Sequence, residues 1–309
     1  TYSSVTYPIF SGFITSYVNT QPSDATEVAF TTITAVDAFR LGNLAQISTV
    51  SGATAGDLSG TRINQILDQI GWPSSMRDVD AGLTTMQSDP ATARTALQAM
   101  QVVTDSEYGA LYVDAIGSFV FQDRSVTAGS IGGTTTLFAD DGTGIGYANA
   151  TWILNDSLVF NSATVSRTGG SPQNSFNQAS IDKYFLHSYN LQDLLMQTDA
   201  VALDYAQAYT ASRAETSIRC DAVELDLYTE NYNSGIIAAL DLDFFDPITV
   251  ITTQPGGSTL EKTLQIFGVS NTITPNSFKT VFTTLEPVID SLILNNTIYG
   301  QLDYNVLSY

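Results

Sequence analysis

The stretch RINQILDQIGWP, from Arg62 to Pro73, carries the clearest secondary-structure signal in the sequence. Four of its apolar residues recur at the spacing i, i+3, i+4 and i+7, which places them on one face of a helix: Ile63, Ile66, Leu67 and Ile70. The Gly-Trp-Pro that follows ends the pattern, because glycine and proline do not continue a helix. The sequence therefore predicts a helix over residues 61–70, with Ile66 and Trp72 packed in the core of their domain.

The next segments predict a second helix and a hairpin. Apolar residues share one face over residues 90–104, and Asp89 and Pro90 suit the N-cap and first helical positions. Two short strands follow at 110–113 and 118–121, and Gly117 in the loop between them can adopt a positive φ. Residues 57–124 are thus predicted to form a compact domain of two helices and a hairpin.

Strand patterns dominate the rest of the chain. The aromatic and β-branched stretches 7–17 and 28–34 predict a hairpin with its turn at 21–24. Residues 125–157 are rich in Gly, Thr and Ser and are expected to be a linker or loop. Beyond them we expect a strand at 158–167, one long helix at 191–213, and then strands only, including 221–228 and a hairpin of 264–272 with 278–285. The predicted fold class is α+β, mostly β.

The composition is acidic because basic residues are scarce. The 309 residues include 11 Lys+Arg and 31 Asp+Glu, which gives a formal net charge of −20, yet charged residues make up only 14%. A field of this sign repels phosphate backbones and anionic headgroups, so the chain is not expected to grip DNA. With no apolar run near the roughly 20 residues of a membrane helix and no basic-then-apolar leader, the chain is predicted to be soluble, without stable membrane insertion. It begins at Thr1, so an upstream segment is expected to have been removed or to be missing.

Few residues of the sequence suggest chemistry. The single cysteine, Cys220, cannot form an intrachain disulfide, and the single histidine, His187, leaves no Cys/His zinc cluster. Three acidic clusters stand out, and we interpret them as solvated faces: Asp140-Asp141, Glu224/Asp226 and Asp241/Asp243/Asp246. In the last of these, Asp241 and Asp243 are expected on the solvent face of a strand, with Leu242 and Phe244 inward. The glycine-rich loop 142–146 matches neither nucleotide motif. No catalytic, cofactor or metal residue is predicted, and the chain is not expected to be an enzyme.

The sequence resembles the tail hub or minor tail proteins of long-tailed bacteriophages. The resemblance lies in the order in which several segments follow one another more than in any single segment. The helix ending in Gly-Trp-Pro is followed by a family-like R-D-hydrophobic-D-x-G and then by a helix and a G-x-L-Y-V-D hairpin. The ordered segments that carry the resemblance are FSGFI (10–14), ITAVDAFRL (33–41), RINQILDQIGWP (62–73), RDVDAG (77–82), EYGALYVD (107–114), GSFVFQDR (117–124), NSATVSRTGG (161–170), SIDKY (180–184) and GVSNTITP (268–275).

This resemblance implies a fold and a role. It implies two related β-barrel-like hub domains with an inserted helix–helix–hairpin domain, and three copies arranged so that six barrels match the six-fold tail tube. The implied domains are an incomplete first barrel at 1–56, the inserted domain at 57–124, the linker or loop at 125–157 and a second barrel at 158–309. Residues 30–33 (FTTI) and 282–285 (FTTL) share a Phe-Thr-Thr motif, and a duplicated barrel would leave a repeat of this kind in the sequence.

The implied role is structural, at the tail tip of the virion. The resemblance implies a homotrimer that joins the tail tube to the tip or baseplate, with a distal tail or tube ring above it and tip or fibre proteins below. Genomic DNA would pass through its channel without specific binding, and a strongly acidic wall suits such passage because it repels DNA. An extracellular carbohydrate-binding or glycan-cleaving β-rich protein is the alternative, since it would share this aromatic, acidic composition.

Overall fold

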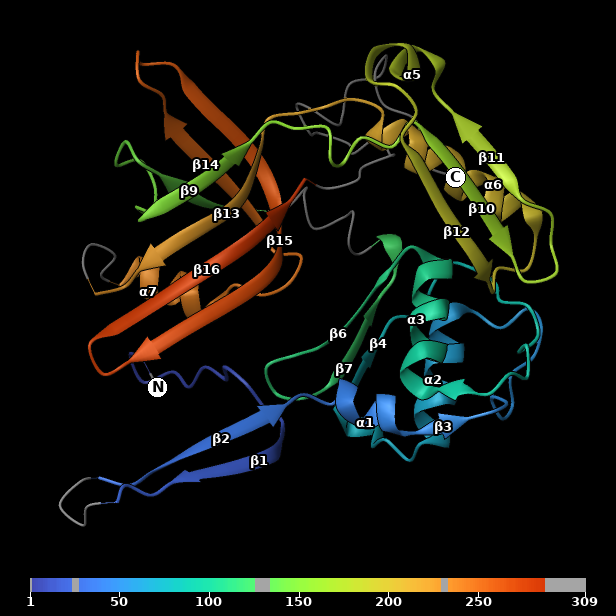
Figure 1. Cartoon of the computed structure of the whole chain (residues 1–309), viewed down its shortest axis with the longest axis horizontal. Coiled ribbons are helices and arrows are strands. Elements are labelled where there is room, and N and C mark those ends of the chain that lie inside the picture. Colours follow the sequence, from blue (N-terminus) through green and yellow to red (C-terminus); the bar gives the residue numbers. More distant parts are fainter. Residues whose placement is uncertain (1, 24–27, 126–133, 229–232, 287–309) are drawn as a thin grey trace. The chain divides into compact units, whose positions relative to one another are not determined.

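The computed structural model describes residues 2–23, 28–125, 134–228 and 233–286, and Figure 1 shows the course of the chain. The chain forms two compact units. The first contains Thr1–Arg124, Ser166–Ser171 and Gln192–Val201, and the second contains the other segments. The assignment of 1–56, 57–124, 125–157 and 158–309 as separate domains stays a prediction.

The described residues of the first unit form one hairpin, two further small sheets and three α-helices. Strands β1 and β2 pair antiparallel with each other, β4, β7 and β6 form a three-stranded sheet in that order, and β3 pairs with β5. Its elements are β1 (Phe13–Thr20), β2 (Phe30–Val36), α1 (Phe39–Leu44), β3 (Gln46–Ile47), α2 (Ser59–Gln69), a 3₁₀ turn (Ser74–Met76), β4 (Arg77–Val79), β5 (Arg94–Thr95), α3 (Ala96–Glu107), β6 (Ala110–Val113) and β7 (Phe119–Gln122).

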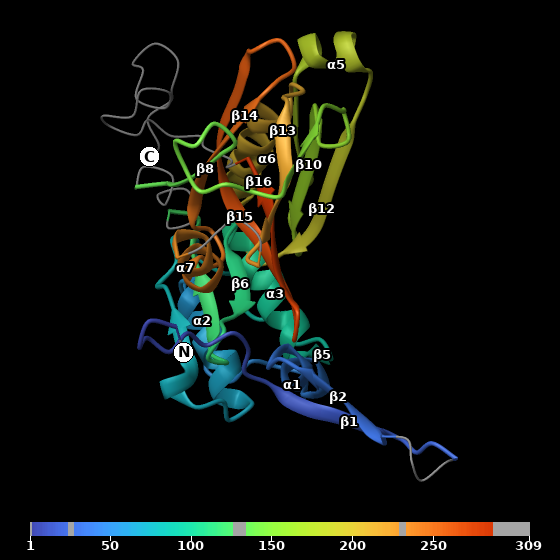
Figure 2. The ribbon, with the colours of Figure 1, turned by 90° about the vertical axis from the view of Figure 1, so that its left-hand side faces the viewer.

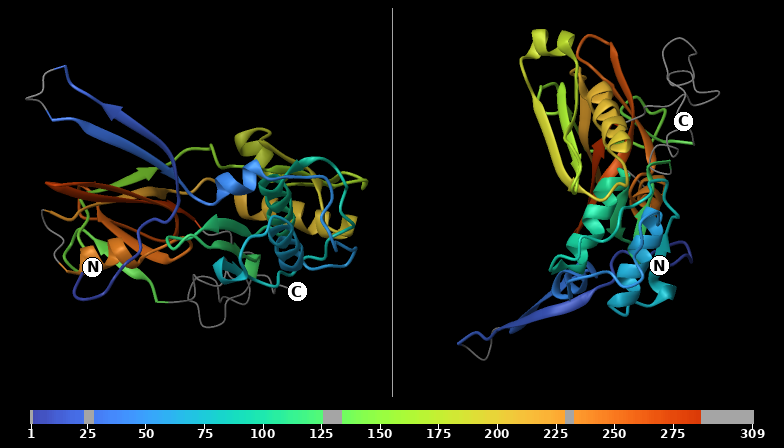
Figure 3. Two further views of the ribbon diagram at one scale, coloured as in Figure 1. Left: turned by 90° about the horizontal axis from the view of Figure 1, so that it is seen from below. Right: turned by 90° about the vertical axis from the view of Figure 1, so that its right-hand side faces the viewer.

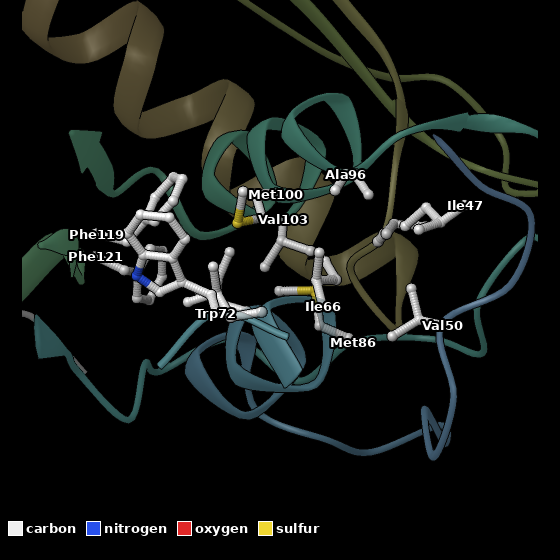
Figure 4. Packing of buried hydrophobic residues seen from close by; sticks show 14 of the residues in the cluster. Ile47, Val50, Ile66, Trp72, Met86, Ala96, Met100, Val103, Phe119 and Phe121 are labelled. Atoms are coloured by element: carbon white, nitrogen blue, oxygen red, sulfur yellow. The ribbon is translucent and has the colours of Figure 1, made fainter. Parts of the chain in front are cut away.

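The core of the first unit lies between α2, α3 and the β4-β7-β6 sheet. Ile66 is fully buried on the inner face of α2, and Trp72 directly after that helix is 8% exposed. The Trp72 ring meets Phe119 of β7 edge-on at 5.1 Å, and its indole N–H donates to the Met76 carbonyl. Figure 4 shows these side chains with Met100 and Val103 of α3. The predicted helix, its end at Gly71 and the burial of Ile66 and Trp72 are confirmed.

The second predicted helix begins later than the sequence suggested. Thr95, not Asp89, is the N-cap of α3, because its hydroxyl accepts from the Gln98 N–H while the Gln98 side chain accepts from the Thr95 N–H. Ala91 has φ of 54°, a left-handed conformation that a helix cannot contain. Asp89 instead pairs with Arg94. The start predicted at residue 90 is therefore wrong by six residues, whereas the β6–β7 hairpin, with Gly117 at φ 93°, is confirmed.

The second unit is built on a six-stranded sheet in the order β8-β14-β15-β16-β13-β9. All its neighbouring strands are antiparallel except β8 and β14. The predicted hairpin is confirmed as β15 and β16. The elements from residue 134 onward are β8 (Thr136–Ala139), β9 (Asn149–Ile153), β10 (Ser162–Arg167), β11 (Gln173–Phe176), α5 (Gln178–Tyr184), β12 (Ser188–Leu194), α6 (Asp199–Arg213), β13 (Arg219–Asp226), α7 (Ser234–Asp241), β14 (Pro247–Thr253), β15 (Thr259–Thr274) and β16 (Ser277–Leu285).

Alternation along the strands explains which face of this sheet is buried. Val223, Leu225 and Leu227 are buried, as predicted, while Glu224 and Asp226 between them are partly exposed. Phe138 of β8 packs against Phe282 of β16 in the same core, with ring centroids 6.0 Å apart. Residues 125–157 thus contain two strands where the sequence predicted a linker or loop. Their strands are short and lie within Gly/Thr-rich sequence, which hides their signal; residues 126–133 lie outside the described residues.

Two helical predictions need correction. The expected helix at 191–213 begins only at Asp199, because residues up to Leu194 belong to β12, which lies beside β10 in the sheet β11-β10-β12. The prediction of strands only after residue 213 is wrong, since Ser234–Asp241 forms α7. Consequently Asp241 and Asp243 do not share a strand face. Asp241 is the last residue of α7, and the Asp243 carboxylate accepts a hydrogen bond from the N–H of Phe244 in the turn that follows.

The predicted barrels do not close among the described residues. The six-stranded sheet has two ends, β8 and β9, that do not pair with each other, and the first 56 residues contribute one hairpin and the short strand β3. The sheet is nevertheless curved. The Tyr147 hydroxyl beside β9 donates to the Ile251 carbonyl of β14 at 3.0 Å, although β9 and β14 are not neighbours in the sheet. A curved, open sheet replaces the expected closed barrel.

Candidate interaction surface

The β1–β2 hairpin exposes apolar side chains on both of its faces. Successive residues of a strand point to opposite faces, so the neighbouring apolar pairs Phe13-Ile14 and Tyr17-Val18 place apolar groups on each. Tyr17 and Phe30 are both 62% exposed. Figures 1 and 2 show β1 and β2 as a ribbon of two strands, and Figure 3 shows it from two further sides. The large exposed apolar residues of the two strands are Phe13, Ile14, Tyr17, Val18, Phe30 and Ile33.

This hairpin lacks the features that usually stabilise or protect one. Isolated two-stranded hairpins are marginal in water, and no other described helix or strand packs extensively against this one. Neither β1 (FITSYVNT) nor β2 (FTTITAV) contains a charged residue or a proline. β1 has a bulge at Thr15, which opposes no residue of β2, whereas β2 is regular. The free edge of β2 therefore has no built-in barrier to strand addition.

The six-stranded sheet has one covered edge and one open edge. The Ala139 N–H of β8 donates to the Ile145 carbonyl, and the Ile145 N–H donates to Leu137, so the following loop covers that edge. β9 pairs only with β13 among the described residues. β9 (NATWI) has no charged residue or proline, and Thr151 in its middle is exposed. β2 and β9 are thus two open, uncharged strand edges.

The first acidic cluster organises a loop. Asp140 accepts from the Thr253 N–H at 2.8 Å and from its hydroxyl at 3.0 Å, which fixes the end of β14. Asp141 accepts from the hydroxyl and the N–H of Thr143, and these bonds lower the pKa of the Asp141 carboxyl. Asp141 is thus occupied within its own loop, as in an ordinary turn, and Asp140 is occupied by Thr253 at the end of β14.

The other two clusters are also engaged locally. Glu224 forms a cross-strand ion pair of 2.9 Å with Lys279, whose pKa this hydrogen bond raises. In the turn after α7, Asp246 accepts from the Asp243 N–H at 2.9 Å, and burial raises the pKa of the Asp246 carboxyl. Within the described ranges no three His, Cys, Asp or Glu side chains are grouped to hold a metal ion.

Cys220 and His187 carry no arrangement for nucleophilic catalysis in the described structure. Cys220 is fully buried in the core of the second unit, and burial raises the pKa of its thiol to about 11. The thiolate is the reactive form of cysteine, so this side chain is inert at neutral pH. The His187 ring nitrogen lies 3.9 Å from Asp156, and its backbone carbonyl accepts from Asn161 and Ser162.

A small polar pocket bears on the glycan-cleaving alternative. Two glutamates line it, Glu215 and Glu286, together with Arg213 and Arg219. Glu215 accepts from Lys183 and Tyr184, and Glu286 pairs with Lys262 and accepts from Ser217. Glycoside hydrolysis needs two carboxyl groups free to act on substrate across a cleft. Both of these are committed to neighbouring side chains, so the pocket does not favour that chemistry.

The sequence predicted the β1–β2 hairpin, but it did not predict that the apolar side chains of the hairpin are exposed. Periodicity shows which residues share a face, and it does not show what covers that face. The signal that was present is the pairing of consecutive apolar residues in β1, which requires cover on both faces of the strand. Sequence reasoning also missed β9, since Asn149–Ile153 lay in a predicted loop.

The described residues contain no helix that is both long and apolar enough to cross a bilayer. No protein-family model matches the sequence, and no curated protein is significantly similar to it.

Solved structures of tail proteins share the fold. The 43 kDa tail protein of prophage MuSo2 from Shewanella oneidensis is 13% identical, with a TM-score of 0.58 over 91% of this chain and 78% of that one. A tail protein from Neisseria meningitidis MC58 is 10% identical, with a TM-score of 0.60 over 90% and 80%. Prophage tail protein gp18 from Listeria monocytogenes EGD-e is 12% identical, with a TM-score of 0.50 over 92% and 81%. The resemblance to phage tail proteins is thus confirmed at the level of the fold.

Proposed function

We propose that this chain is a structural component of a bacteriophage tail. The observation that carries the proposal is that three tail proteins from different bacteria share its fold over at least 90% of its length. A likeness that spans both compact units is more specific than one confined to a single widespread domain. The two open strand edges support the same role, because a protein built for assembly needs surfaces that another chain completes.

More specifically, we propose that the chain forms a trimeric hub at the tail tip. There it joins the tube, through a distal ring above, to tip or fibre proteins below, and its acidic surface lines the channel through which DNA leaves. The net charge of −20 supports passage without adhesion, because DNA binds proteins mainly through Lys and Arg contacts to phosphates. In this role the chain is not an enzyme and needs no cofactor.

Gold-conjugated antibodies raised against the purified chain test this assignment. They are applied to particles of the virus that encodes the chain and to its host cells, and both are imaged by electron microscopy. The proposal expects label at the tail tip, with pre-immune serum giving none. Label confined to the capsid or to the cell envelope would contradict it, and label on the envelope would favour the glycan-binding alternative.

A further inference from the structure

We infer that strand β2 of one copy pairs edge to edge with strand β9 of a second copy of this chain. The inference rests on the proposed tail function, in which copies of one chain assemble, and it names the contact between them. The donor is the apolar β1–β2 hairpin of the first unit, and the acceptor is the open end of the six-stranded sheet in the second unit.

Net charge restricts where two copies can meet. Each chain carries −20, so two copies repel, and a stable contact needs surface from which charge is absent. The segments Phe30–Val36 and Asn149–Ile153 contain no charged residue. Pairing with β9 would also make the two-stranded hairpin part of a larger sheet, and isolated two-stranded hairpins are marginal in water.

The regularity of β2 selects it as the donor edge. Thr15 bulges from β1, and bulges disrupt the ladder that an incoming strand would extend. All seven residues of β2 have a partner in β1, the extra residue of the bulge lies in β1, and Phe30 to Ala35 are all exposed. Four of those seven are β-branched residues on exposed strand positions, Thr31, Thr32, Ile33 and Thr34, and such residues favour sheet pairing.

Length, charge and cover select β9 as the acceptor edge. The edge of β8 is covered by Ile145. The edge strands β4 and β12 contain charged residues, and the edge strands β6 and β11 are only four residues long. With five residues, β9 is the longest uncharged edge strand in the described structure outside the hairpin itself. Neither β2 nor β9 has a backbone partner on its outer side among the described residues.

A contact between two different edges has a consequence for symmetry. Each copy offers β2 to one neighbour and β9 to another, which makes the interface heterologous. Heterologous interfaces build rings when the rotation closes. The pairing therefore fits an assembly with cyclic symmetry, such as a tail hub, whereas a reciprocal exchange of β2 and β9 between two copies would give a closed two-fold dimer.

Cysteine cross-linking between differently tagged chains tests the pairing. Both chains carry Cys220→Ala to remove the native thiol; one adds Thr32→Cys in β2 and the other adds Thr151→Cys in β9, both at exposed positions. Thr34→Cys and Asn149→Cys extend the scan to the neighbouring register. We expect at least one mixed pair to oxidise to a dimer about tenfold faster than either variant alone, because pairing raises the local thiol concentration.

Every other cross-linking pattern overturns the inference. Faster dimerisation of Thr32→Cys with itself would indicate two-fold pairing of hairpins. A double-cysteine chain that forms only an internal disulfide at all protein concentrations would place β2 against its own β9. Preferential cross-linking of Thr32→Cys to a cysteine in β6 or β11 would identify another acceptor.

A charge variant provides an independent readout. Thr32→Glu puts a carboxylate on the β2 edge, and Ser258→Glu puts the same charge on an exposed turn between β14 and β15. In sedimentation velocity we expect Thr32→Glu to lose self-association and Ser258→Glu to keep it, with unchanged circular dichroism for both. If both variants associate like the wild type, or if the wild type stays monomeric at the cross-linking concentration, the pairing is wrong. Gold label at the tail tip would still support the tail function.

Discussion

The indole N–H of Trp152 donates to the Thr252 hydroxyl at 2.9 Å, although Trp152 lies on β9 and Thr252 on β14, the sixth and second strands of the sheet. The Tyr147 hydroxyl shares the same partner at 2.6 Å. Strands separated by three others in a flat sheet would lie far beyond hydrogen-bond reach, since neighbours are roughly 4.8 Å apart. The sheet therefore curves until its β9 end comes back to β14, and two side chains hold it without strand pairing.

Replacing Thr252 with valine tests how far these bonds stabilise the curvature. Thr252→Val keeps the shape of the side chain and removes the hydroxyl, so the Trp152 N–H loses its partner. Both side chains are partly buried, so in urea denaturation we expect the free energy of unfolding to fall by about 0.5–1.5 kcal/mol, the net contribution of a typical hydrogen bond. Thr259→Val, at an exposed position on β15, is the matched control and should change it little. Equal effects of the two substitutions would show that the contact does not hold the sheet.

The core of the first unit should depend on one aromatic side chain. Trp72→Ala removes the ring that packs against Phe119 and the indole bond to Met76. We expect a loss of about 3–5 kcal/mol in the free energy of unfolding, typical of large-to-small core substitutions. Trp72→Phe keeps part of the packing and should cost less. A near-neutral Trp72→Ala would contradict the burial of this residue.

The reactivity of Cys220 follows from its burial. Because burial raises the pKa of its thiol to about 11, the native chain should contain almost no thiolate at pH 8. A thiol reagent such as DTNB should therefore react slowly with the native chain and fully with the urea-unfolded chain at the same pH. Rapid labelling of the native chain would place Cys220 at the surface.

Asp57 should make part of the stability of the first unit depend on pH. Burial alone would raise the pKa of its carboxyl, but hydrogen bonds from Thr54, Gln65 and Arg62 lower it to about 2. A carboxyl whose pKa is lowered by folding stabilises the protein above its unfolded value of about 3.9, and this contribution is lost as pH falls toward 2.

The corresponding measurement compares the wild type with Asp57→Asn. Urea unfolding at pH 6 should show a destabilised variant, and at pH 2.5 the difference between the two proteins should shrink, because the wild-type carboxyl is then largely protonated in the unfolded state. A difference that stays constant between these pH values would mean that Asp57 acts only through its shape and neutral hydrogen bonds.

The sequence predicted elements whose signals are local. The helix α2 has a full apolar stripe and a Gly-Trp-Pro end, and the hairpins β6–β7 and β15–β16 have turn residues between strand-like runs. The start of α6 could not be predicted, because Leu194 and Leu195 fit a helical stripe as well as a buried strand end. Their burial beside β10 and Ser106 is a tertiary effect, in which the Leu195 N–H donates to the Ser106 hydroxyl.

The interaction surface was less predictable than the fold. A strand pattern does not reveal whether a face or an edge finds a partner within the same chain, so neither the exposure of β2 nor the open edge of β9 follows from periodicity. The cover of β8 by Ile145 depends on a glycine-rich loop whose Gly144 has no room for a Cβ beside Leu137. Such contacts belong to the folded unit and leave no repeat in the sequence.

A cryo-electron microscopy reconstruction of the tail of the virus that encodes this chain tests the proposed hub role most directly. If the chain is the tail hub, the two compact units fit density at the tail tip in three copies around the channel, with β2 of each copy beside β9 of the next. Tail-tip density fully explained by other chains, with this chain absent from purified particles, would contradict it.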